Sequence, residues 1–499
     1  MGRLPENVNS PCGTAVRVRA VGSNPGVNRV MKRRAVAVIG TIAAAALIAA
    51  GCGSDDDGGS SGDDSGSKFD GSMKVGAIVP LTGDLQSFGG AGNEALELAT
   101  EVANEALADA GYDGEVELLV EDGETKEDAA KAAAEKLAGE DVSCIVGDWA
   151  SSSTEAVAQS VTIDEGIPLI SPASTAGSIT TLDDDGTVFR TVPSDNLQAQ
   201  VLANAISEDV GEGGTVVVAA RNNAYGSGLA SAFVEAGTEA GLEVGEPILM
   251  DPDAPKASSE AAEITSGDAP DAFLVIDYPD SFLKLGPELV KTGKWDPAKT
   301  WGSDGMKDTT LPETGGKELT EGMRGTAPTS AEAPAAEAFD TAWNEGGDRS
   351  DRQTYDADNF DALIACVLAA VAADSADPAD VAEALTDVSG GGEKYTFENL
   401  GDAFTAAKDG DDVDYEGAAS PLDWDENGDP ASAFYEIWSY TGGKLGSLET
   451  IPFSAEGDAA PAEDEAAAEG TETTEEPTGT TEAEPGDATE TEPADETEG

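Results

Sequence analysis

The stretch VSCIVGDWASSSTEAVAQSVTIDEGIPLIS, residues 142–171, decides the fold of this chain. Two apolar runs, VSCIVGD and IPLIS, enclose a segment from Thr154 to Asp164 that we predict to be a helix. Apolar strands of this kind, alternating with helices, are typical of a parallel sheet that is covered on both faces. Two hydroxyl-rich loops, Trp149 to Thr154 and Ser171 to Thr175, follow the strands. Because parallel strands end at one edge of a sheet, these loops predict a crevice for a small anionic or zwitterionic molecule.

The same alternation of strand and helix continues on both sides of this stretch. The runs VGAIVP (75–80) and VELLVED (116–122) complete a first set of four strand–helix units. A second set includes TVVVAA (215–220), EVGEPILM (243–250), AFLVID (272–277) and TWGSD (300–304). One open sheet of so many strands would be unusually large. We therefore predict an α/β protein with two Rossmann-like lobes, whose parallel sheets are flanked by helices and joined by a hinge of several chain crossings.

The order of the runs sets the expected domain boundaries. Lobe 1 is expected at 68–192, lobe 2 at 193–326, a return to lobe 1 at 327–425 and a return to lobe 2 at 426–453. The first return contains two predicted helices, Ala335 to Glu345 and Tyr355 to Ala372, and the second contains the strand FYEIWSY. Hinge crossings are expected near Val192 and Gly325.

The segment before Lys68 predicts an exported, lipid-anchored protein. Residues 31–34 form a basic segment and residues 35–50 an apolar one that is too short to span a bilayer permanently. The run from Ile48 to Cys52 resembles a bacterial lipobox, which implies cleavage before Cys52 and lipidation of its thiol. We expect a signal peptide at 1–51, with the true start at Met31, and a lipidated cysteine with a flexible linker at 52–67. The alternatives are a long basic region from Met1 and an uncleaved hydrophobic anchor. The mature protein is then expected at the outer face of the cytoplasmic membrane or in the periplasm.

Charge and composition exclude several classes of function. The net charge is −72, from 99 acidic and 27 basic residues, so the chain lacks the basic surface that nucleic-acid binding requires. The segment 454–499 has 17 acidic residues and no Lys or Arg, which predicts a disordered tail. The chain has no histidine. Histidine-based catalytic triads and most zinc or copper sites are therefore excluded, and no metal or cofactor is expected.

Two cysteines remain beyond the signal region. Cys144 lies in the strand VSCIVGD and Cys366 in the helical run LIACVLAA. An exported compartment permits a disulfide between them, but buried free thiols are equally compatible with the sequence.

The loops after the strands hold the candidate binding residues. Ser152 stands three residues before Glu155 and predicts a capping box, which would leave the Ser151 hydroxyl free to face the crevice. The next loop would offer the backbone of Ala173 and the hydroxyl of Thr175. Amides and hydroxyls of this kind favour an anionic group such as a carboxylate.

The second lobe ends its strands with different residue types. Tyr225, Tyr278 and Asp304 follow three of its strands. Tyrosine rings form apolar walls with a polar tip, and an aspartate can pair with an ammonium group. Phe88, in LQSFGG, is either at the rim of the site or in the core. Each of these residues, taken alone, could also be structural.

Several motifs, in order, resemble a known family. The runs PLTGDLQSFG, EDGETKEDAAKAAAEKL, GDWASSST, EGIPLISPAST, FRTVPSD, YGSG, GSDG and PLDWDENGD lie between Lys74 and Gly443. Together they resemble the leucine/isoleucine/valine-binding family of ABC-transporter receptors, which have the type I periplasmic-binding fold. The resemblance implies that Ser151, Ala173 and Thr175 bind a ligand carboxylate, that Tyr225 and Tyr278 border the site, and that Asp304 pairs with the α-ammonium.

The chain also departs from the best-known members of that family. Gly123 and Ala150 stand where those members have a cysteine pair, and Trp149 replaces a smaller aliphatic residue beside the ligand. Asp304 is shorter than the glutamate of those members. The bulky indole at position 149 leaves the ligand side chain undecided.

From the residues and the resemblance, we expect a lipid-anchored receptor that binds an amino acid, branched-chain or a close relative, and delivers it to an ABC permease and its ATPase. The alternatives are a receptor for an aromatic solute or for a small amide such as urea, and a sensory ligand-binding subunit. A hydrolase that uses Ser151 is disfavoured because the chain lacks both histidine and a GxSxG elbow.

Overall fold

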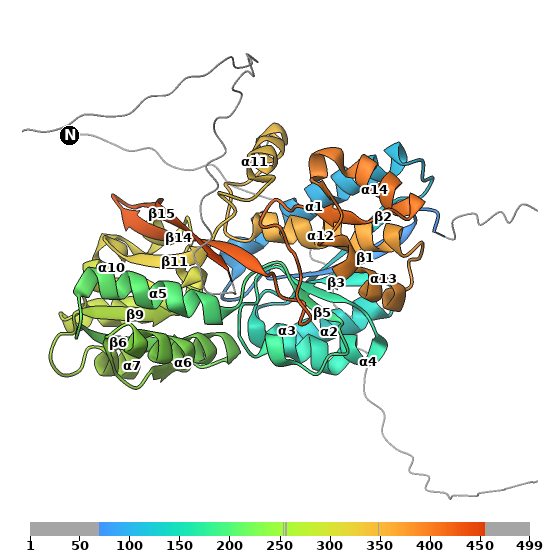
Figure 1. The fold of residues 1–499 in the computed structure, drawn as a ribbon. Helices are drawn as coiled ribbons and strands as arrows, with labels where there is room; N and C mark the ends of the chain where they lie inside the picture. Colours follow the sequence, from blue (N-terminus) through green and yellow to red (C-terminus); the bar gives the residue numbers. More distant parts are fainter. Residues whose placement is uncertain (1–68, 253, 255–256, 348, 455–499) are drawn as a thin grey trace, which may run out of the picture. The chain divides into compact units, whose positions relative to one another are not determined.

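Five parallel strands form the sheet of lobe 1 (Figure 1). The structure is a computed structural model, and it describes residues 69–252, 254, 257–347 and 349–454. The strand order is β2-β1-β3-β4-β5. The strands are β1 (Met73–Val79), β2 (Val116–Asp122), β3 (Cys144–Val146), β4 (Leu169–Ser171) and β5 (Val188–Arg190). Every pairing between them is parallel, because a helix or a long loop connects each strand to the next.

The helices of lobe 1 follow the apolar periodicity of the sequence. They are α1 (Gln86–Asp109), α2 (Glu127–Ala138), α3 (Ser151–Val157), η1 (Ala158–Thr162), α4 (Ile163–Glu165) and η2 (Ile179–Thr181). The segment predicted as one helix from Thr154 to Asp164 is thus α-helical at both ends, with a π-helical turn, η1, in its middle.

A larger sheet forms lobe 2. Its order is β15-β14-β11-β10-β9-β6-β7, and β8 also pairs with β6. The strands are β6 (Thr215–Arg221), β7 (Glu243–Val244), β8 (Ile248–Met250), β9 (Ala272–Ile276), β10 (Thr300–Gly302), β11 (Arg324–Pro328), β14 (Ser432–Thr441) and β15 (Lys444–Ser454). The run EVGEPILM forms two short strands, β7 and β8, where the sequence predicted one. The last two strands are antiparallel, as a hairpin must be.

Helices and short turns connect the strands of lobe 2. They are α5 (Asp195–Val210), α6 (Ala224–Glu239), α7 (Ser258–Ile264), α8 (Pro279–Thr292), η3 (Pro297–Lys299), η4 (Asp304–Met306), α9 (Leu311–Gly315) and α10 (Lys317–Thr320). Because η4 starts at Asp304, directly after β10, this carboxylate lies at the carboxyl edge of the second sheet.

A return segment completes the core of lobe 1. It contains α11 (Ala336–Glu345), α12 (Asp356–Ala372), α13 (Pro378–Ala384), η5 (Thr386–Val388), β12 (Glu393–Tyr395), η6 (Phe397–Asn399), α14 (Leu400–Asp409) and β13 (Val413–Tyr415). Helix α12 is apolar on almost every face and is buried along nearly its whole length, which is typical of a central helix. It packs beside α1, although the two helices are far apart in the sequence (Figure 1).

The described chain passes between the two sheets at three places. The crossings lie between β5 and α5, between β11 and α11, and between β13 and β14. The expected crossing near Gly325 is displaced, because Gly325 lies inside β11, where its backbone packs against the Trp438 ring. The chain leaves this sheet only after Pro328. Strand β15 also includes Ser454, which is the first residue of the segment that we expected to be a disordered tail.

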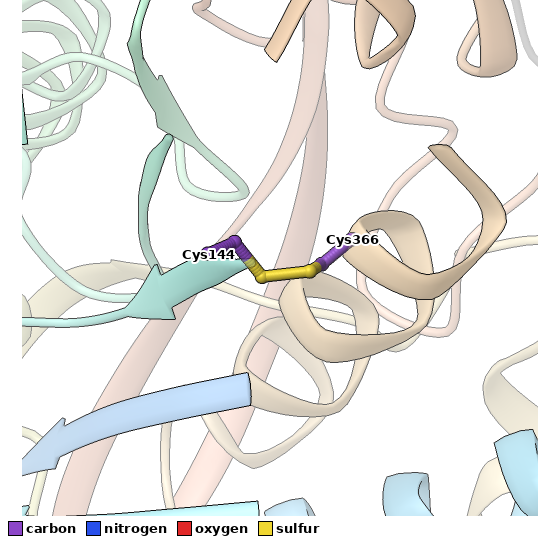
Figure 2. Close-up of a disulfide and its surroundings, with 2 residues drawn as sticks. All are labelled: Cys144 and Cys366. Atoms are coloured by element: carbon purple, nitrogen blue, oxygen red, sulfur yellow. A yellow bond between two sulfur atoms is a disulfide. The ribbon is translucent and has the colours of Figure 1, made fainter. Parts of the chain in front are cut away.

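A disulfide joins Cys144 of β3 to Cys366 of α12 (Figure 2). The two Cα atoms are 6.6 Å apart and the residues are 222 positions apart in sequence. Of the two alternatives that the sequence left open, the structure therefore has the disulfide. It fastens the central helix of the return segment to the middle strand of the first sheet.

No helix in residues 69–454, apart from the gaps in that range, is both long and apolar enough to cross a membrane. The predicted signal peptide, Cys52 and its linker, and the acidic tail from residue 455 onward lie outside the described residues.

Candidate functional site

Ten residues enclose a small pocket at the facing ends of the two sheets. The cavity that they leave is about 10 Å³. The lining residues are Leu85, Phe88, Trp149, Ser151, Ala173, Tyr225, Tyr278, Asp304, Gly305 and Tyr355. Seven of the eight ligand-binding residues named from the sequence are in this set. The eighth, Thr175, is buried next to Ser174 and does not line the pocket.

The loop after β3 presents Ser151 at the start of α3. The Ser151 Oγ accepts a hydrogen bond of 3.2 Å from the amide of Ala176, so its own proton is free to be donated to a ligand. The predicted capping box is absent: the N-cap is Ala150, and its side chain makes no capping bond. Ser152 instead accepts a hydrogen bond of 3.0 Å from the amide of Ala224 in lobe 2. A contact between lobes therefore replaces the local cap that the sequence suggested.

The loop after β4 has alternating free and occupied amides. The amide of Ser174 donates to the Ser171 Oγ at 3.1 Å, and that of Ala176 donates to Ser151. The amides of Ala173 and Thr175 have no acceptor among the described residues. The buried Thr175 hydroxyl lies near the Asp195 carboxyl without making a hydrogen bond of ordinary geometry in the described part of the chain. Buried polar groups are nearly always hydrogen-bonded, so this loop has unused donors for an anionic group.

The carbonyl of Asp148 ties the two loops together. It accepts hydrogen bonds from Ser171 at 2.7 Å, from Thr154 at 2.9 Å and from Ser174 at 3.2 Å. The side chain of Asp148 is fully buried, and burial raises its pKa to about 7, although the amides of Ala150 and Trp149 oppose this shift. Sequence reasoning did not single out Asp148, because a single aspartate after a strand is a common turn residue.

Asp304 is the acidic residue of the pocket. Its Oδ1 accepts a hydrogen bond of 2.7 Å from the Tyr225 hydroxyl, and its Oδ2 accepts one from the Tyr355 hydroxyl. Burial raises the pKa of Asp304, and these two hydrogen bonds limit the rise by stabilising the ionised form. Burial also keeps the pKa of both tyrosines well above the ordinary value, so they stay neutral donors.

A second buried carboxylate, Asp195, lies close to Asp304. It is the first residue of α5 and is 1% exposed. Neither of its side-chain oxygens has a hydrogen-bond partner in the described part of the chain. Burial raises the pKa of Asp195 well above its usual value, and the charge of Asp304 raises it further. The nearby Thr175 hydroxyl and the charge of Arg190 only partly oppose this rise in pKa. Burial and mutual repulsion thus favour the protonated form of one of these carboxyls, and a cationic ligand group beside them would favour the ionised forms.

Aromatic rings form the remaining walls. The Tyr225 and Tyr278 rings are stacked with centroids 5.4 Å apart, and Trp149 meets Tyr355 edge-on at 6.1 Å. Phe88, which the sequence left as either rim or core, is fully buried and also lines the pocket. Trp149 fits only because α1 has a glycine at position 92, where a Cβ would lie 2.5 Å from the indole.

Charged side chains join the two lobes beside the pocket. Asp84 of lobe 1 accepts a hydrogen bond of 2.7 Å from Arg221 of lobe 2, and Lys284 of lobe 2 approaches its other oxygen at 3.0 Å. The Arg221 guanidinium also lies 4.5 Å from the centre of the Tyr278 ring. The lobes are thus held together directly over one wall of the pocket.

Sequence reasoning missed Tyr355 and Asp195. Tyr355 is the N-cap of α12, in the return segment and far along the chain from the other lobe 1 loops, and has an unusual positive φ of 76°. The only sequence signal for Asp195 was its place in FRTVPSD, which we used as a marker of resemblance and not as a site.

Several known proteins are similar to this chain. Leu/Ile/Val-binding protein homolog 3 of Brucella melitensis is 28% identical over 170 residues, which cover 34% of this chain and 45% of that protein. The chemotactic signal transduction system substrate-binding protein BasB of Halobacterium salinarum is 27% identical over 361 residues, covering 70% of this chain and 83% of that protein. The chain spans about 45% of the length of the first curated relatives that it matches.

Solved structures share the fold. The leucine-binding protein LivK from Thermotoga maritima matches with a TM-score of 0.62 and 23% identity, over 76% of this chain and 98% of that chain. A solute-binding protein from R. palustris, in complex with benzoate, matches with a TM-score of 0.59 and 19% identity, over 77% and 98% of the two chains. These matches confirm the predicted type I periplasmic-binding fold.

The sequence profile described as periplasmic binding protein matches residues 72–409, more than half of the chain. The chain therefore belongs to the periplasmic binding protein family, as its resemblance to the leucine/isoleucine/valine-binding receptors predicted.

Proposed function

We propose that this protein is an extracytoplasmic receptor that binds an amino acid of the branched-chain type, or a close relative, and delivers it to an ABC importer. One observation carries the proposal: the pocket has two opposite poles. Donors at Ser151 and Ala173 face it from lobe 1, with the unpaired amide of Thr175 in the same loop, and the Asp304 carboxylate faces it from lobe 2. This separation matches a zwitterion, whose carboxylate and ammonium lie on one carbon.

The walls support an apolar ligand side chain. Leu85, Phe88, Trp149 and the ring faces of Tyr278 and Tyr355 surround the rest of the pocket. The cavity among these side chains is only about 10 Å³, roughly the room of one water molecule. A ligand is therefore expected to enter only when the lobes separate and the lining side chains move apart. The proximity of Asp195 to Asp304 supports an ammonium over a neutral amide, because a cation would relieve the repulsion that raises the pKa of Asp195.

Binding is expected to require an opening and closing of the lobes. The direct contacts at Asp84 and Ser152 close the mouth of the pocket, so a ligand enters only when they separate. The ligand then favours the closed form because it contacts groups on both lobes at once, which is a population shift driven by differential affinity. Nothing in this scheme needs a catalytic step, and we propose no enzymatic activity.

Three related probes test the two poles separately by isothermal titration calorimetry. L-leucine has both charges, 4-methylpentanoate lacks the ammonium and L-leucinamide lacks the carboxylate. The full zwitterion is expected to bind most tightly. If 4-methylpentanoate or benzoate binds as tightly as L-leucine or more so, the receptor is one for organic acids, and the assignment of Asp304 to an ammonium is wrong. Urea serves as the probe for the small-amide alternative.

Asp304→Asn is the matching variant. It keeps the shape of the side chain and removes the negative charge, so L-leucine is expected to bind more weakly by about 1.5–3 kcal/mol, the size of a hydrogen bond to a charged group. Affinity for 4-methylpentanoate is expected to change little, because this probe has no ammonium. An unchanged affinity for L-leucine in the same titration would refute the role of Asp304.

A sensory receptor is the second candidate, supported by the similarity to BasB over 70% of the chain. The two candidates share the binding site and differ in the partner. Uptake of radiolabelled leucine by cells that lack this protein separates them, since only a transport receptor is expected to be needed for uptake.

We also propose that the protein is anchored through a lipid on Cys52, which lies outside the described residues. A Cys52→Ser protein is expected to leave the membrane fraction and to lose incorporation of labelled palmitate. Retention in the membrane fraction would indicate an uncleaved hydrophobic anchor.

A further inference from the structure

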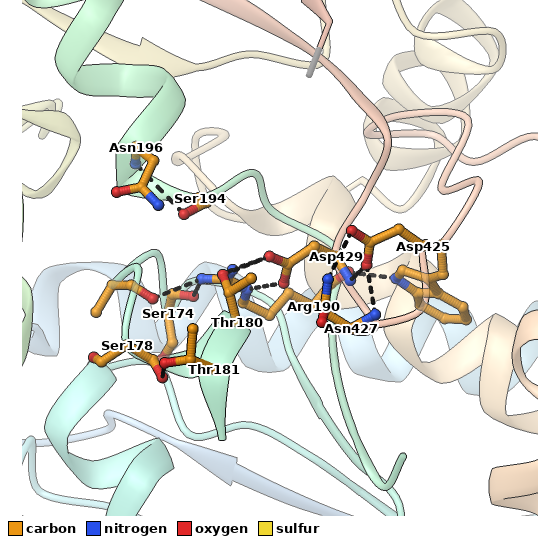
Figure 3. Close-up of polar contacts among 12 residues, drawn as sticks. Ser174, Ser178, Thr180, Thr181, Arg190, Ser194, Asn196, Asp425, Asn427 and Asp429 are labelled. Atoms are coloured by element: carbon orange, nitrogen blue, oxygen red, sulfur yellow. Dashed lines mark hydrogen bonds and ion pairs between the residues drawn. The ribbon is translucent and has the colours of Figure 1, made fainter. Parts of the chain in front are cut away.

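Arg190 is a buried cation that was not part of the predicted site. It contacts the loop after β4, residues 172–178, which we call the ligand loop. Arg190 is the last residue of β5 and has no exposed surface. Its Nε donates to the Asp429 Oδ1 at 2.7 Å, and one terminal nitrogen pairs with the Oδ2 of the same carboxylate (Figure 3). That terminal nitrogen also donates to the Thr180 hydroxyl at 2.8 Å.

The other terminal nitrogen of Arg190 holds the ligand loop. It donates to the carbonyl of Ser174 at 3.3 Å and to that of Ala176 at 3.0 Å. All five N–H donors of the guanidinium thus have an acceptor, which is the full capacity of the side chain. Three of these contacts, to Asp429 and Thr180, fix the guanidinium, and the other two fix the carbonyls of Ser174 and Ala176.

The orientation of these carbonyls determines where the loop amides point. In a planar trans peptide the C=O of one residue and the N–H of the next point in opposite directions. Because the Ser174 carbonyl faces Arg190, the Thr175 amide faces away from it. The Thr175 carbonyl in turn accepts a hydrogen bond of 2.7 Å from the amide of Asp195, which directs the Ala176 amide toward Ser151. Arg190 therefore orients the unpaired Thr175 amide, and the Asp195 amide orients the paired amide of Ala176.

Asp429 is itself held in place by the motif WDENGD. The Asp425 carboxylate accepts hydrogen bonds from the amides of Asn427 at 2.8 Å and Asp429 at 3.1 Å (Figure 3). Gly428 has a φ of 71°, and a Cβ there would lie 2.3 Å from the Val188 carbonyl, so the turn fits against β5 only with glycine. The Arg190 amide donates to the Gly428 carbonyl at 2.9 Å. This turn lies in the last crossing between the sheets, so the contact joins segments that are remote in sequence.

We propose that the ion pair of Arg190 and Asp429 is the positioning element of the ligand loop: it fixes the peptides that begin with the Ser174 and Ala176 carbonyls, so that the Thr175 amide stays free, and this arrangement contributes the preference of the site for a carboxylate. The inference rests on the proposed function, since it names the residues that make the carboxylate pole selective. Neither residue touches the ligand. The effect is transmitted through two backbone carbonyls.

Arg190→Lys is the first test. A lysine keeps the charge that Asp429 requires, but its three donors on one nitrogen cannot reproduce the planar fork that reaches two carbonyls and a carboxylate together. We expect affinity for L-leucine to fall about tenfold, the equivalent of one lost charge-assisted contact. Affinity for L-leucinamide, which lacks the carboxylate, is expected to stay nearly constant. The ratio of the two dissociation constants therefore moves toward one.

Arg324→Lys is the matched control. Arg324 also binds an aspartate with both terminal nitrogens, Asp209 at 2.8 and 2.6 Å, but it lies in β11 and contacts no residue of the ligand loop. The same substitution there is expected to leave the ratio unchanged. If Arg190→Lys weakens both probes equally, or weakens neither, the pair is only a structural contact and the proposal is wrong.

Hydrogen exchange gives a readout that does not depend on any ligand. In the wild-type protein the peptides that cover 172–178 are expected to exchange slowly, and in Arg190→Lys faster, with no change in Arg324→Lys. Unchanged exchange in this loop overturns the proposal even if affinities shift. If the wild-type protein binds none of the probes, the proposed function fails, while the exchange result still decides whether Arg190 orders the loop.

A double variant covers the case in which Arg190→Lys does not fold. Arg190→Met combined with Asp429→Leu removes both charges together, so no lone charge stays buried. The expected results are the same: hydrogen exchange is faster at 172–178, and the ratio of the dissociation constants of L-leucine and L-leucinamide is closer to one. A double variant with the wild-type ratio and wild-type exchange would contradict the proposal.

Discussion

Tyr355 alters the chemistry of Asp304 from the opposite lobe. Its hydroxyl donates to the Oδ2 of Asp304, while Tyr225 donates to the Oδ1. Both bonds stabilise the ionised carboxylate against the effect of burial. The site thus keeps its negative pole with donors that belong to two different segments of the chain.

Tyr355→Phe is expected to make ligand binding more sensitive to acid. Loss of the hydroxyl raises the pKa of Asp304 further, and an ammonium ligand needs the ionised form. Affinity is present above this pKa and is lost as the pH falls through it, so the loss is expected to begin at a higher pH in the variant. Calorimetry with L-leucine between roughly pH 5 and pH 8, a range around neutrality, measures the shift.

Tyr415→Phe is the matched control for this prediction. Tyr415 donates to the Oδ1 of Asp361 at 2.9 Å, also in a buried site but away from the pocket. Its pH profile for L-leucine binding is expected to equal that of the wild type. Equal profiles for Tyr355→Phe and the wild type would show that Tyr355 does not influence the charge of Asp304.

At the scale of elements, the disulfide joins two parts of the site. Strand β3 leads to the loop with Trp149 and Ser151, and α12 begins next to Tyr355. The bond between Cys144 and Cys366 holds this strand and this helix in a fixed relation within the buried core of lobe 1. It also closes a long loop of the unfolded chain, which reduces the entropy of the unfolded state.

Replacing both cysteines by alanine is expected to lower the free energy of unfolding by about 2–5 kcal/mol. Urea denaturation of the oxidised wild type, the reduced wild type and the variant measures the difference. The reduced wild type is expected to resemble the variant, and a reductant is expected to leave the variant unchanged. Equal stability of the oxidised and reduced wild type would show that the bond contributes little to folding.

The sequence predicted the elements better than their ends. The strands named from the sequence all lie in one of the two sheets, because burial of a repeating apolar face decides the type of element, but β5, β11 and β15 were not among them. The start of α3 differed, since the Ser152 hydroxyl bonds to Ala224 of the other lobe and does not cap its own helix. Local capping rules cannot anticipate that a serine oxygen accepts its hydrogen bond from a remote part of the fold.

At the scale of the whole molecule, Asp84 joins the lobes. Burial alone would raise the pKa of Asp84, but the charges of Arg221 and Lys284 lower it below the ordinary value. The carboxylate therefore stays ionised over the usual pH range and keeps the contact between lobes. Arg221 also packs on Tyr278, so the contact supports one wall of the pocket.

Asp84→Asn is expected to weaken L-leucine binding by about 1–2 kcal/mol, because the closed form loses charge-assisted contacts that only it makes. Added salt is expected to weaken the wild type more than the variant, since it screens the lost contacts. Calorimetry at two salt concentrations measures both effects. Asp128→Asn, which removes an exposed ion pair with Lys131 inside lobe 1, is the control and is expected to bind normally. Identical affinity and salt dependence in Asp84→Asn would mean that closure does not depend on this contact.

The sequence by itself determined the two α/β lobes and the loops that face each other, because apolar periodicity and the ends of parallel strands are local properties. It also named most of the residues around the pocket, including Ser151 and Asp304. Only the tertiary structure decided that Tyr355 and Asp195 join Asp304 and that Arg190 and Asp429 hold the ligand loop. These partners come from chain segments that are remote in sequence, because the chain crosses between the sheets three times. A local sequence pattern cannot predict which buried charged groups will be in contact after these crossings.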